Sequence, residues 1–141
     1  MEYSRRDVGL LPLFAVAAAT SAAAATPLVS KTFRFEDLPV KTNGQNRSRA
    51  ILNGETHSGF PIEMHMTELA AGQAPHPPHH HVHEEMVMMV DGTLEVTISG
   101  RSVTLGPGSS AYVASNEEHG WRNTGTSRAL YFVLALGRDQ S

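Results

Sequence analysis

The sequence lacks several features that mark common kinds of protein. It contains no cysteine, which excludes disulfide bonds and zinc sites built from thiolates. Basic residues are not in excess, because 11 Lys and Arg stand against 14 Asp and Glu, a net charge of −3. A chain with this balance has no basic surface suited to nucleic acid, so we expect no nucleic-acid partner. The sequence also shows no internal repeat and no sign of a second domain, so one compact domain is expected.

The first 25 residues have the pattern of an export signal. Arg5 and Arg6 precede an apolar run over residues 8–19, and small residues follow up to position 25. The run is too short to span a membrane and contains Pro12, so we predict cleavage and no membrane contact afterwards. The Ser4-Arg5-Arg6 triplet resembles a twin-arginine signal, although Val8 and Gly9 replace the usual Phe-Leu. The mature protein is therefore predicted to be exported, periplasmic or secreted.

After the signal, the hydrophobic pattern has the two-residue period of β-strands, and no stretch has the period of a helix. The expected strands are residues 31–36, 49–52, 61–69, 85–90, 93–99, 110–114 and 128–136. Asp91-Gly92 is typical of a type I′ turn and predicts a tight hairpin between the fourth and fifth of these strands. Residues 40–49 are polar and turn-rich, which predicts a surface loop.

A histidine-rich run supplies the most informative pattern in the chain. In an extended segment His79 and His81 project from the same face, and Glu85 has the same parity. His119, delivered by a later loop, is the natural fourth ligand. Neutral imidazoles and one carboxylate suit a divalent transition metal.

The same run has a second interpretation that the spacing leaves open. Five histidines lie close together in a proline-rich loop, at positions 76, 79, 80, 81 and 83. Such a tract can be a loose, solvated metal scavenger rather than an ordered site. Under the ordered-site hypothesis, His76, His80 and His83 are expected to face solvent or to orient the ligands.

These residues carry a resemblance to a known family. Gly72, His79, His81, Glu85 and Gly92 match the first motif of the cupins, G-x5-H-x-H-x3-4-E-x6-G, with one extra residue after Gly72. The resemblance covers about residues 60 to 136.

The second cupin motif, G-x5-P-x-G-x2-H-x3-N, follows in the correct order. Gly108, His119 and Asn123 match it, while Ala114 and Asn116 occupy the positions of its proline and second glycine. Asparagine tolerates the left-handed backbone that this glycine usually adopts, so the second change is expected to be mild.

The resemblance implies a fold and a division of the chain. It implies a single-domain antiparallel jelly-roll β-barrel with the metal inside. Residues 1–25 form the signal, residues 26–59 the N-terminal strands and a loop, and residues 60–137 the barrel. Residues 26–41 are expected to add an edge strand or to cross to a second protomer, and a homodimer is expected because it would cover exposed barrel edges.

The resemblance also implies a range of functions. One divalent metal is expected, with iron, manganese or nickel favoured and zinc or copper as alternatives, held by His79, His81, Glu85 and His119. The leading hypothesis is a metal-dependent enzyme acting on a small oxygen-bearing molecule, of dioxygenase (quercetinase), lyase or isomerase type. Glu85 is the candidate catalytic residue, because it could take up a proton. The alternative is a non-enzymatic protein that binds a small molecule or the metal itself.

Two further residues are candidates for the substrate pocket. His65 has the opposite strand parity to its methionine neighbours, so it can be an acid–base group in the pocket or a hydrogen-bonded structural histidine. Trp121 can form a pocket wall or belong to the core. The methionines at 64, 66, 86, 88 and 89 would suit Cu(I), but their strand positions favour a packing role.

Overall fold

The computed structural model describes residues 27–138, and the predicted export signal lies outside them. Within this range the chain forms nine strands and one short 3₁₀ turn, η1 (Phe35–Asp37). The strands are β1 (Val40–Asn43), β2 (Asn46–Glu55), β3 (Pro61–Leu69), β4 (Glu84–Asp91), β5 (Leu94–Ile98), β6 (Arg101–Leu105), β7 (Ser110–Val113), β8 (His119–Arg122) and β9 (Ala129–Leu136). Residues 27–138 contain no α-helix, and none of their elements is a helix with the length and apolarity of a membrane span.

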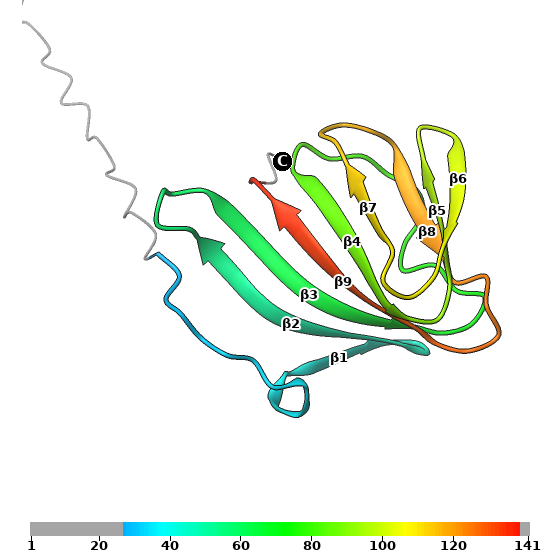
Figure 1. Cartoon of the computed structure of the whole chain (residues 1–141), viewed down its shortest axis with the longest axis horizontal. Helices are drawn as coiled ribbons and strands as arrows, with labels where there is room; N and C mark the ends of the chain where they lie inside the picture. The colour runs from blue at the N-terminus through cyan, green and yellow to red at the C-terminus, as the bar shows by residue number, and fades with distance from the viewer. Residues whose placement is uncertain (1–26, 139–141) are drawn as a thin grey trace, which may run out of the picture.

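Two antiparallel sheets face each other, as Figure 1 shows. The larger sheet has the order β1-β2-β3-β9-β4-β7, and the smaller has the order β6-β5-β8. The buried core lies between them and includes Leu69, Val87 and Tyr131 from the larger sheet and Leu94 and Trp121 from the smaller. The predicted all-β single domain with antiparallel, jelly-roll-like sheets is confirmed.

Alternation along the strands decides which side chains enter this interior. On β9 the residues Ala129, Tyr131, Val133 and Ala135 are buried, and the residues between them are only half-buried. The cross-strand register places Val133 between His65 on β3 and Val87 on β4. Because directly paired residues share one face of a sheet, His65 belongs to the interior face.

The methionines divide between the two faces of the larger sheet. Met89 is in the core, whereas Met64 and Met86 flank Leu134 on the opposite, outer face. Met66 and Met88 flank Phe132 in the next row of the same outer face. The outer methionines pack among apolar neighbours and lie on the other side of the sheet from the histidine ligands.

The prediction of a tight hairpin at Asp91-Gly92 is wrong. β4 pairs with β7 and β9, while β5 pairs with β6 and β8, so the chain passes from one sheet to the other at this point. Gly92 is needed for close packing, because a Cβ atom there would lie 2.6 Å from the carbonyl oxygen of Arg128. The tight two-residue hairpin is instead Ser99-Gly100, with φ values of 47° and 77°, between β5 and β6.

Two expectations for the N-terminal part are also wrong. Residues 31–36 form no strand and end in η1, and Phe33 and Phe35 remain exposed, because alternation without a pairing partner does not make a strand. The loop expected over residues 40–49 is a hairpin, in which β1 pairs with β2 across a turn at Gly44-Gln45. A polar sequence was compatible with a strand here because β1 is an exposed edge strand.

Candidate metal centre and adjoining pocket

The candidate ligands come from three separate segments. Glu85 is near the start of β4, and His119 begins β8. His79 and His81 lie on the loop between β3 and β4, and this loop is tied to β8 by two backbone hydrogen bonds. The His79 N–H donates to the carbonyl of His119 at 3.0 Å, and the His119 N–H donates to the carbonyl of His79 at 2.9 Å. The histidine loop is therefore ordered against a strand of the barrel.

The structure brings the four predicted ligands together. The ligand atoms of His79, His81 and His119 all lie within 4.8 Å of one another. Glu85 Oε2 is 3.2 Å from His119 Nε2, and Glu85 Oε1 is 3.6 Å from His81 Nε2. Three imidazoles thus converge on a common point, and the Glu85 carboxylate lies beside two of them.

Hydrogen bonds to backbone carbonyls fix the orientation of two of the rings. His81 Nδ1 lies 2.7 Å from the carbonyl oxygen of His83, and His119 Nδ1 lies 2.8 Å from that of Glu117. A carbonyl only accepts, so Nδ1 carries a proton in both rings and Nε2 is the atom left to bind a metal. Both Nε2 atoms therefore face the common point, and hydrogen bonds of this kind orient metal-bound histidines.

The fit to a metal is tested by the buried atoms that lack a partner. Among residues 27–138, the buried side-chain atoms without a hydrogen-bond partner are His79 Nδ1, His81 Nε2, Glu85 Oε2 and His119 Nε2. Leaving a buried polar atom unsatisfied costs roughly 1–3 kcal/mol. All four atoms belong to the predicted ligands, and one divalent cation would satisfy them together. The residues present therefore fit a metal of the nitrogen- and oxygen-binding kind.

The neighbouring histidines differ from one another in their positions. His76 and His80 are exposed, and the ring of His76 contacts the ring of His79 at a centroid distance of 4.2 Å. His83 is half-buried, stacks on His81 at 3.5 Å and approaches Glu85 Oε1 to 3.5 Å. His81, His83 and Glu85 form a second group whose ligand atoms lie close enough to share an ion. His83 is thus closer to the centre than the sequence suggested.

Burial and neighbouring charge favour the neutral form of His79. Desolvation lowers the pKa of His79 below its ordinary value, and the nearby His76, His119 and His81 lower it further. An imidazole must be neutral to coordinate a metal, so this shift favours ligation near neutral pH.

Two residues of the second motif support the loop that carries His119. Asn116 has φ 62°, the left-handed backbone expected where the motif has glycine, and its N–H donates to the carbonyl of His81. Asn123 is fully buried and donates from Nδ2 to the carbonyls of Leu69 and Ser127. Asn123 therefore ties β8 to the end of β3 and contacts no candidate ligand directly in these bonds.

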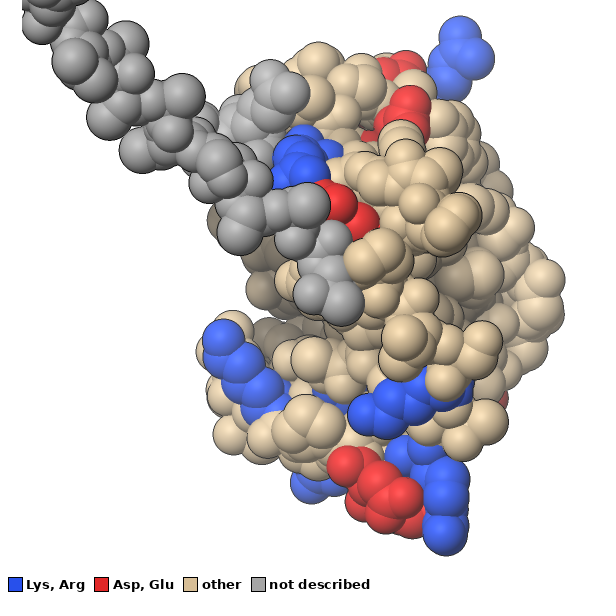
Figure 2. All heavy atoms as spheres, turned by 90° about the vertical axis from the view of Figure 1, so that its left-hand side faces the viewer, with Lys and Arg blue, Asp and Glu red and all other residues tan. Residues whose placement is uncertain are grey.

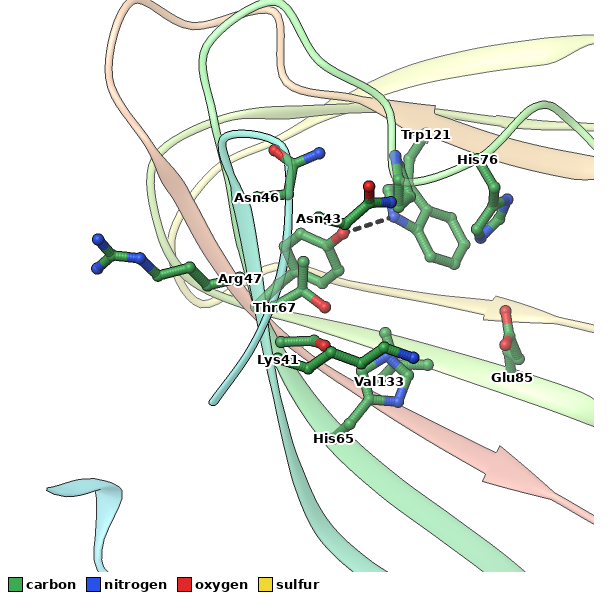
Figure 3. A pocket seen from close by; sticks show the side chains of 13 residues that line it. Lys41, Asn43, Asn46, Arg47, His65, Thr67, His76, Glu85, Trp121 and Val133 are labelled. Atoms are coloured by element: carbon green, nitrogen blue, oxygen red, sulfur yellow. Dashed lines mark hydrogen bonds between the residues drawn. The ribbon is translucent and has the colours of Figure 1, made fainter. Parts of the chain in front are cut away.

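A cavity of about 230 Å³ adjoins the candidate metal centre, and Glu85 forms part of its wall. His65 and Trp121, the two predicted pocket residues, both line it. Trp121 Nε1–H donates to the hydroxyl of Tyr131 at 2.9 Å, the bond drawn as a dashed line in Figure 3. Trp121 is also buried in the core, so it belongs to the core and to the cavity wall at once.

His65 is paired with a carboxylate that the sequence did not reveal. Its Nδ1 lies 3.1 Å from both oxygens of Glu63, two residues earlier on β3. An ionised carboxylate only accepts, so Nδ1 carries the proton and Nε2 is left to exchange a proton in the pocket. The i, i+2 spacing on one strand face was the available signal for this pair.

Other lining residues come from the N-terminal hairpin and were missed. Lys41, Asn43, Asn46, Arg47 and Ser48 belong to β1 and β2 and line the cavity opposite the histidine loop. Tyr131 was also missed, and burial raises the pKa of its hydroxyl to about 12. The sequence placed the hairpin in a loop, so it gave no reason to bring these residues to the pocket.

Comparison with known proteins agrees with this architecture. A family model described as a cupin domain matches residues 65–135. The fold is similar to that of an RmlC-like cupin from Shewanella frigidimarina, with a TM-score of 0.64 and 16% identity over 82% of this chain and 96% of that one. The sequence matches no curated protein.

Two similar structures are described as enzymes. One is the polyketide cyclase RemF from Streptomyces resistomycificus, with a TM-score of 0.64 and 16% identity over 80% of this chain and 83% of that one. The other is a predicted oxalate decarboxylase from Thermotoga maritima, with a TM-score of 0.66 and 16% identity over 77% of this chain and all of that one. At these identities the likeness establishes the fold, and the chemistry has to be inferred from the site.

Proposed function

Because this chain belongs to the cupin family, we propose that it is an exported, metal-dependent enzyme that acts on a small oxygen-bearing molecule. The observation that carries the proposal is the convergence of four buried, unpartnered ligand atoms beside a cavity of about 230 Å³. Cupins bind small-molecule substrates, and this cavity is the space in which one would reach the site.

His79, His81, Glu85 and His119 would hold the ion, and iron, manganese or nickel suits the set, with zinc or copper as alternatives. A divalent metal supplies Lewis-acid or oxygen chemistry when bound at such a site. The reaction classes within reach are therefore those of a dioxygenase, a lyase or an isomerase.

The protein's own groups would orient the substrate and move its protons. His65, held by Glu63, offers Nε2 as an acid–base group in the cavity. Glu85 is a second carboxylate on the wall and can accept a proton. Trp121 and Tyr131 form an aromatic wall that excludes water from one side of the bound molecule.

A non-enzymatic binding protein remains the second candidate, since the same barrel could capture a small molecule or the metal itself. The His65–Glu63 pair favours the enzyme, because a binding site has no need of an oriented acid–base group. Substrate candidates should be screened for turnover, including dioxygen consumption, with wild-type protein and the His65→Gln variant. Turnover that is lost in His65→Gln while metal content is unchanged would support the enzyme, whereas binding without turnover would favour the binder.

The metal itself is tested by elemental analysis of protein purified from its own compartment without added metal. We expect close to one equivalent of iron, manganese or nickel, and almost none in a His79→Ala/His119→Ala control. Tight zinc would favour a hydrolytic or structural role, and absence of metal from both proteins would contradict the proposal.

Export is a separate part of the proposal and rests on residues 1–25 of the sequence. A twin-arginine route would let the protein fold around its metal before it meets the copper and zinc of the export compartment, which compete strongly for these ligands. Replacing Arg5 and Arg6 by lysine should reduce both export and the content of the native metal. Unchanged export and metal content in that variant would refute the twin-arginine part.

A homodimer is proposed from the outer face of the larger sheet. Leu130, Phe132, Leu134 and Leu136 of β9 lie half-buried on that face, with methionines on both sides. An apolar sheet face of this kind favours pairing with a second copy. Light scattering on the purified protein should give twice the monomer mass, and a monomer at micromolar concentration would exclude the dimer.

A further inference from the structure

The cavity has one end that the proposed metal chemistry does not use, formed by the β1–β2 hairpin. Lys41 on β1 pairs with Ser48, which pairs with Thr67, which pairs with Tyr131. This row of paired residues crosses the interior face of the larger sheet, so Lys41 belongs to that face although its strand is at the exposed edge. The hairpin therefore extends the interior surface and places an ammonium group at the cavity mouth.

Lys41 supplies the ammonium group of this cavity, and Glu63, whose carboxylate contacts His65, lines an adjoining pocket with it. Among residues 27–138 the structure shows no ion pair between Lys41 and a carboxylate, and Glu85 supplies the carboxylate of the cavity wall. Arg47 also lines the cavity, but its side chain extends away from the other lining residues in Figure 3, and its Nη1 lies 3.9 Å from Glu68 Oε2. The Lys41 side chain points toward Val133 and His65. In the wider view of Figure 2, several Lys and Arg side chains lie on the lower part of the face, with acidic side chains among them.

The other groups at this end are suited to an organic anion. Asn46 uses its Oδ1 to accept from the N–H of Ala70, so the amide NH₂ remains as a donor beside the cavity. Asn43 adds a second amide, and Trp121, Tyr131 and Val133 provide an apolar wall. The cavity volume is below the ~300–1,000 Å³ typical of sites for drug-sized ligands. A ligand that fills it must be small.

We infer that the substrate or ligand of this site is a small organic carboxylate, whose negative charge is recognised by Lys41 at the mouth of the cavity. This inference rests on the proposed function, because it names the class of molecule taken by the same site. A carboxylate fits better than a phosphate, since phosphate sites commonly use several cations or the N–H groups of a helix N-terminus. Here there is one unpaired ammonium, and residues 27–138 contain no α-helix.

The chain provides its own reporters for a test. Trp121 is the single tryptophan and lines the cavity, so its fluorescence should change when a ligand enters. Lys31 and Lys41 are the only two lysines in the sequence, and Lys31 lies over the ring of Phe33 rather than on the cavity wall. Lys31→Gln is therefore a matched control for Lys41→Gln.

The experiment titrates acetate, butyrate and succinate against acetamide, butyramide and succinamide, with inorganic phosphate as a separate arm. In wild-type protein we expect at least one acid to bind about tenfold or more tightly than its amide, as a charge-assisted hydrogen bond predicts. Lys41→Gln should lose that preference and Lys31→Gln should keep it. No preference in the wild type, or an equal preference in Lys41→Gln, would overturn the inference, and tighter binding of phosphate would overturn the choice of carboxylate.

A second measurement needs no variant. After reductive methylation with ¹³C-formaldehyde, which keeps the lysine charge, the acid that binds should shift the Lys41 methyl signal and leave that of Lys31 in place. A shift of both signals or of neither would contradict a specific role for Lys41.

The titrations are run on metal-loaded and on chelator-treated protein, to separate this inference from the proposed function. A Lys41-dependent preference in a protein that takes up no metal even when metal is supplied would uphold the carboxylate site and refute the metal-dependent enzyme. If the metal-loaded protein turns over neutral molecules and Lys41→Gln does not change that turnover, the metal-dependent enzyme is supported and the carboxylate site is refuted.

Discussion

The interior between the two sheets has two ends that differ in how well their buried atoms are satisfied. At the core end, Leu69, Val87 and Leu94 are fully buried and pack against other apolar side chains. At the metal end, a buried ring nitrogen of His79, a buried ring nitrogen of His119 and a buried oxygen of Glu85 have no hydrogen-bond partner within the described chain. The first end stabilises the fold, whereas the second holds polar atoms ready for a ligand and lowers stability until one binds.

The largest expected effect is on the core end. Leu94→Ala should lower the free energy of unfolding by about 3 kcal/mol, because it removes a fully buried side chain and leaves a cavity. Urea denaturation of chelator-treated protein measures this loss. The exposed Val103→Ala serves as the control and should change the free energy by less than about 0.5 kcal/mol. A loss below about 1 kcal/mol in Leu94→Ala would show that the core end is not the stabilising one.

The metal end should respond mainly through its affinity for metal. His119→Ala should weaken metal binding by about a hundredfold or more, equivalent to about 2.7 kcal/mol, because it removes one ligand and the ring that contacts two others. The metal-free variant should also lose roughly 1–3 kcal/mol of stability, because the ring is fully buried and its Nδ1 gives up the hydrogen bond to the Glu117 carbonyl.

Competition with a chelator measures the affinity, and urea denaturation measures the metal-free stability. The exposed His80→Ala is the matched control and should keep wild-type affinity. If His80→Ala and His119→Ala lost metal equally, the histidine run would be an unordered scavenging tract. The metal end would then hold no ordered set of ligand atoms to contrast with the core.

The two ends were not equally accessible to prediction from the sequence. Pro61–Leu69 was predicted with its observed bounds, because a proline begins it and apolar residues alternate along it. The spacing of His79, His81 and Glu85 grouped them as candidate ligands, because side chains an even number of residues apart in an extended segment leave the same face. His119 joined them because a later loop was expected to carry it to the same site. These signals are local, so one sequence is enough to show them.

What the sequence did not predict depends on pairings between distant segments. Asp91-Gly92 has the composition of a hairpin turn, but β4 and β5 find their partners in different sheets. Lys41 enters the interior face only because β1 pairs with β2, and Tyr131 reaches Trp121 only through the packing of the two sheets. Register of this kind follows from the whole fold and leaves little trace in any single segment.

Tyr131 and Trp121 lie between the two ends and can sharpen the comparison. Tyr131→Phe should cost about 1–2 kcal/mol of stability, because it leaves the buried Trp121 Nε1–H without its acceptor. Metal affinity should not change, since neither residue is a candidate ligand. Urea denaturation and chelator competition on the same preparation test both statements. A large loss of metal in Tyr131→Phe would mean that the core end also sets the geometry of the metal end.

The smallest effect is a pH dependence that belongs to the core end. Burial raises the pKa of Tyr131 to about 12, against about 10 in an unfolded chain. Between these values the unfolded state releases a proton that the folded state retains, so stability falls as pH rises above 10 and is unaffected by this group below it. At pH 11 the loss should be about 1 kcal/mol.

Denaturation of chelator-treated wild-type protein and Tyr131→Phe at pH 9 and pH 11 measures the difference, since the variant lacks the titrating hydroxyl. Histidine ligands are already neutral at both values, so the metal end contributes nothing to the change. An equal loss in the two proteins would show that Tyr131 is hydrated in the folded state. The core end would then be open to water from the cavity. The two ends would differ only in how much water reaches their polar atoms.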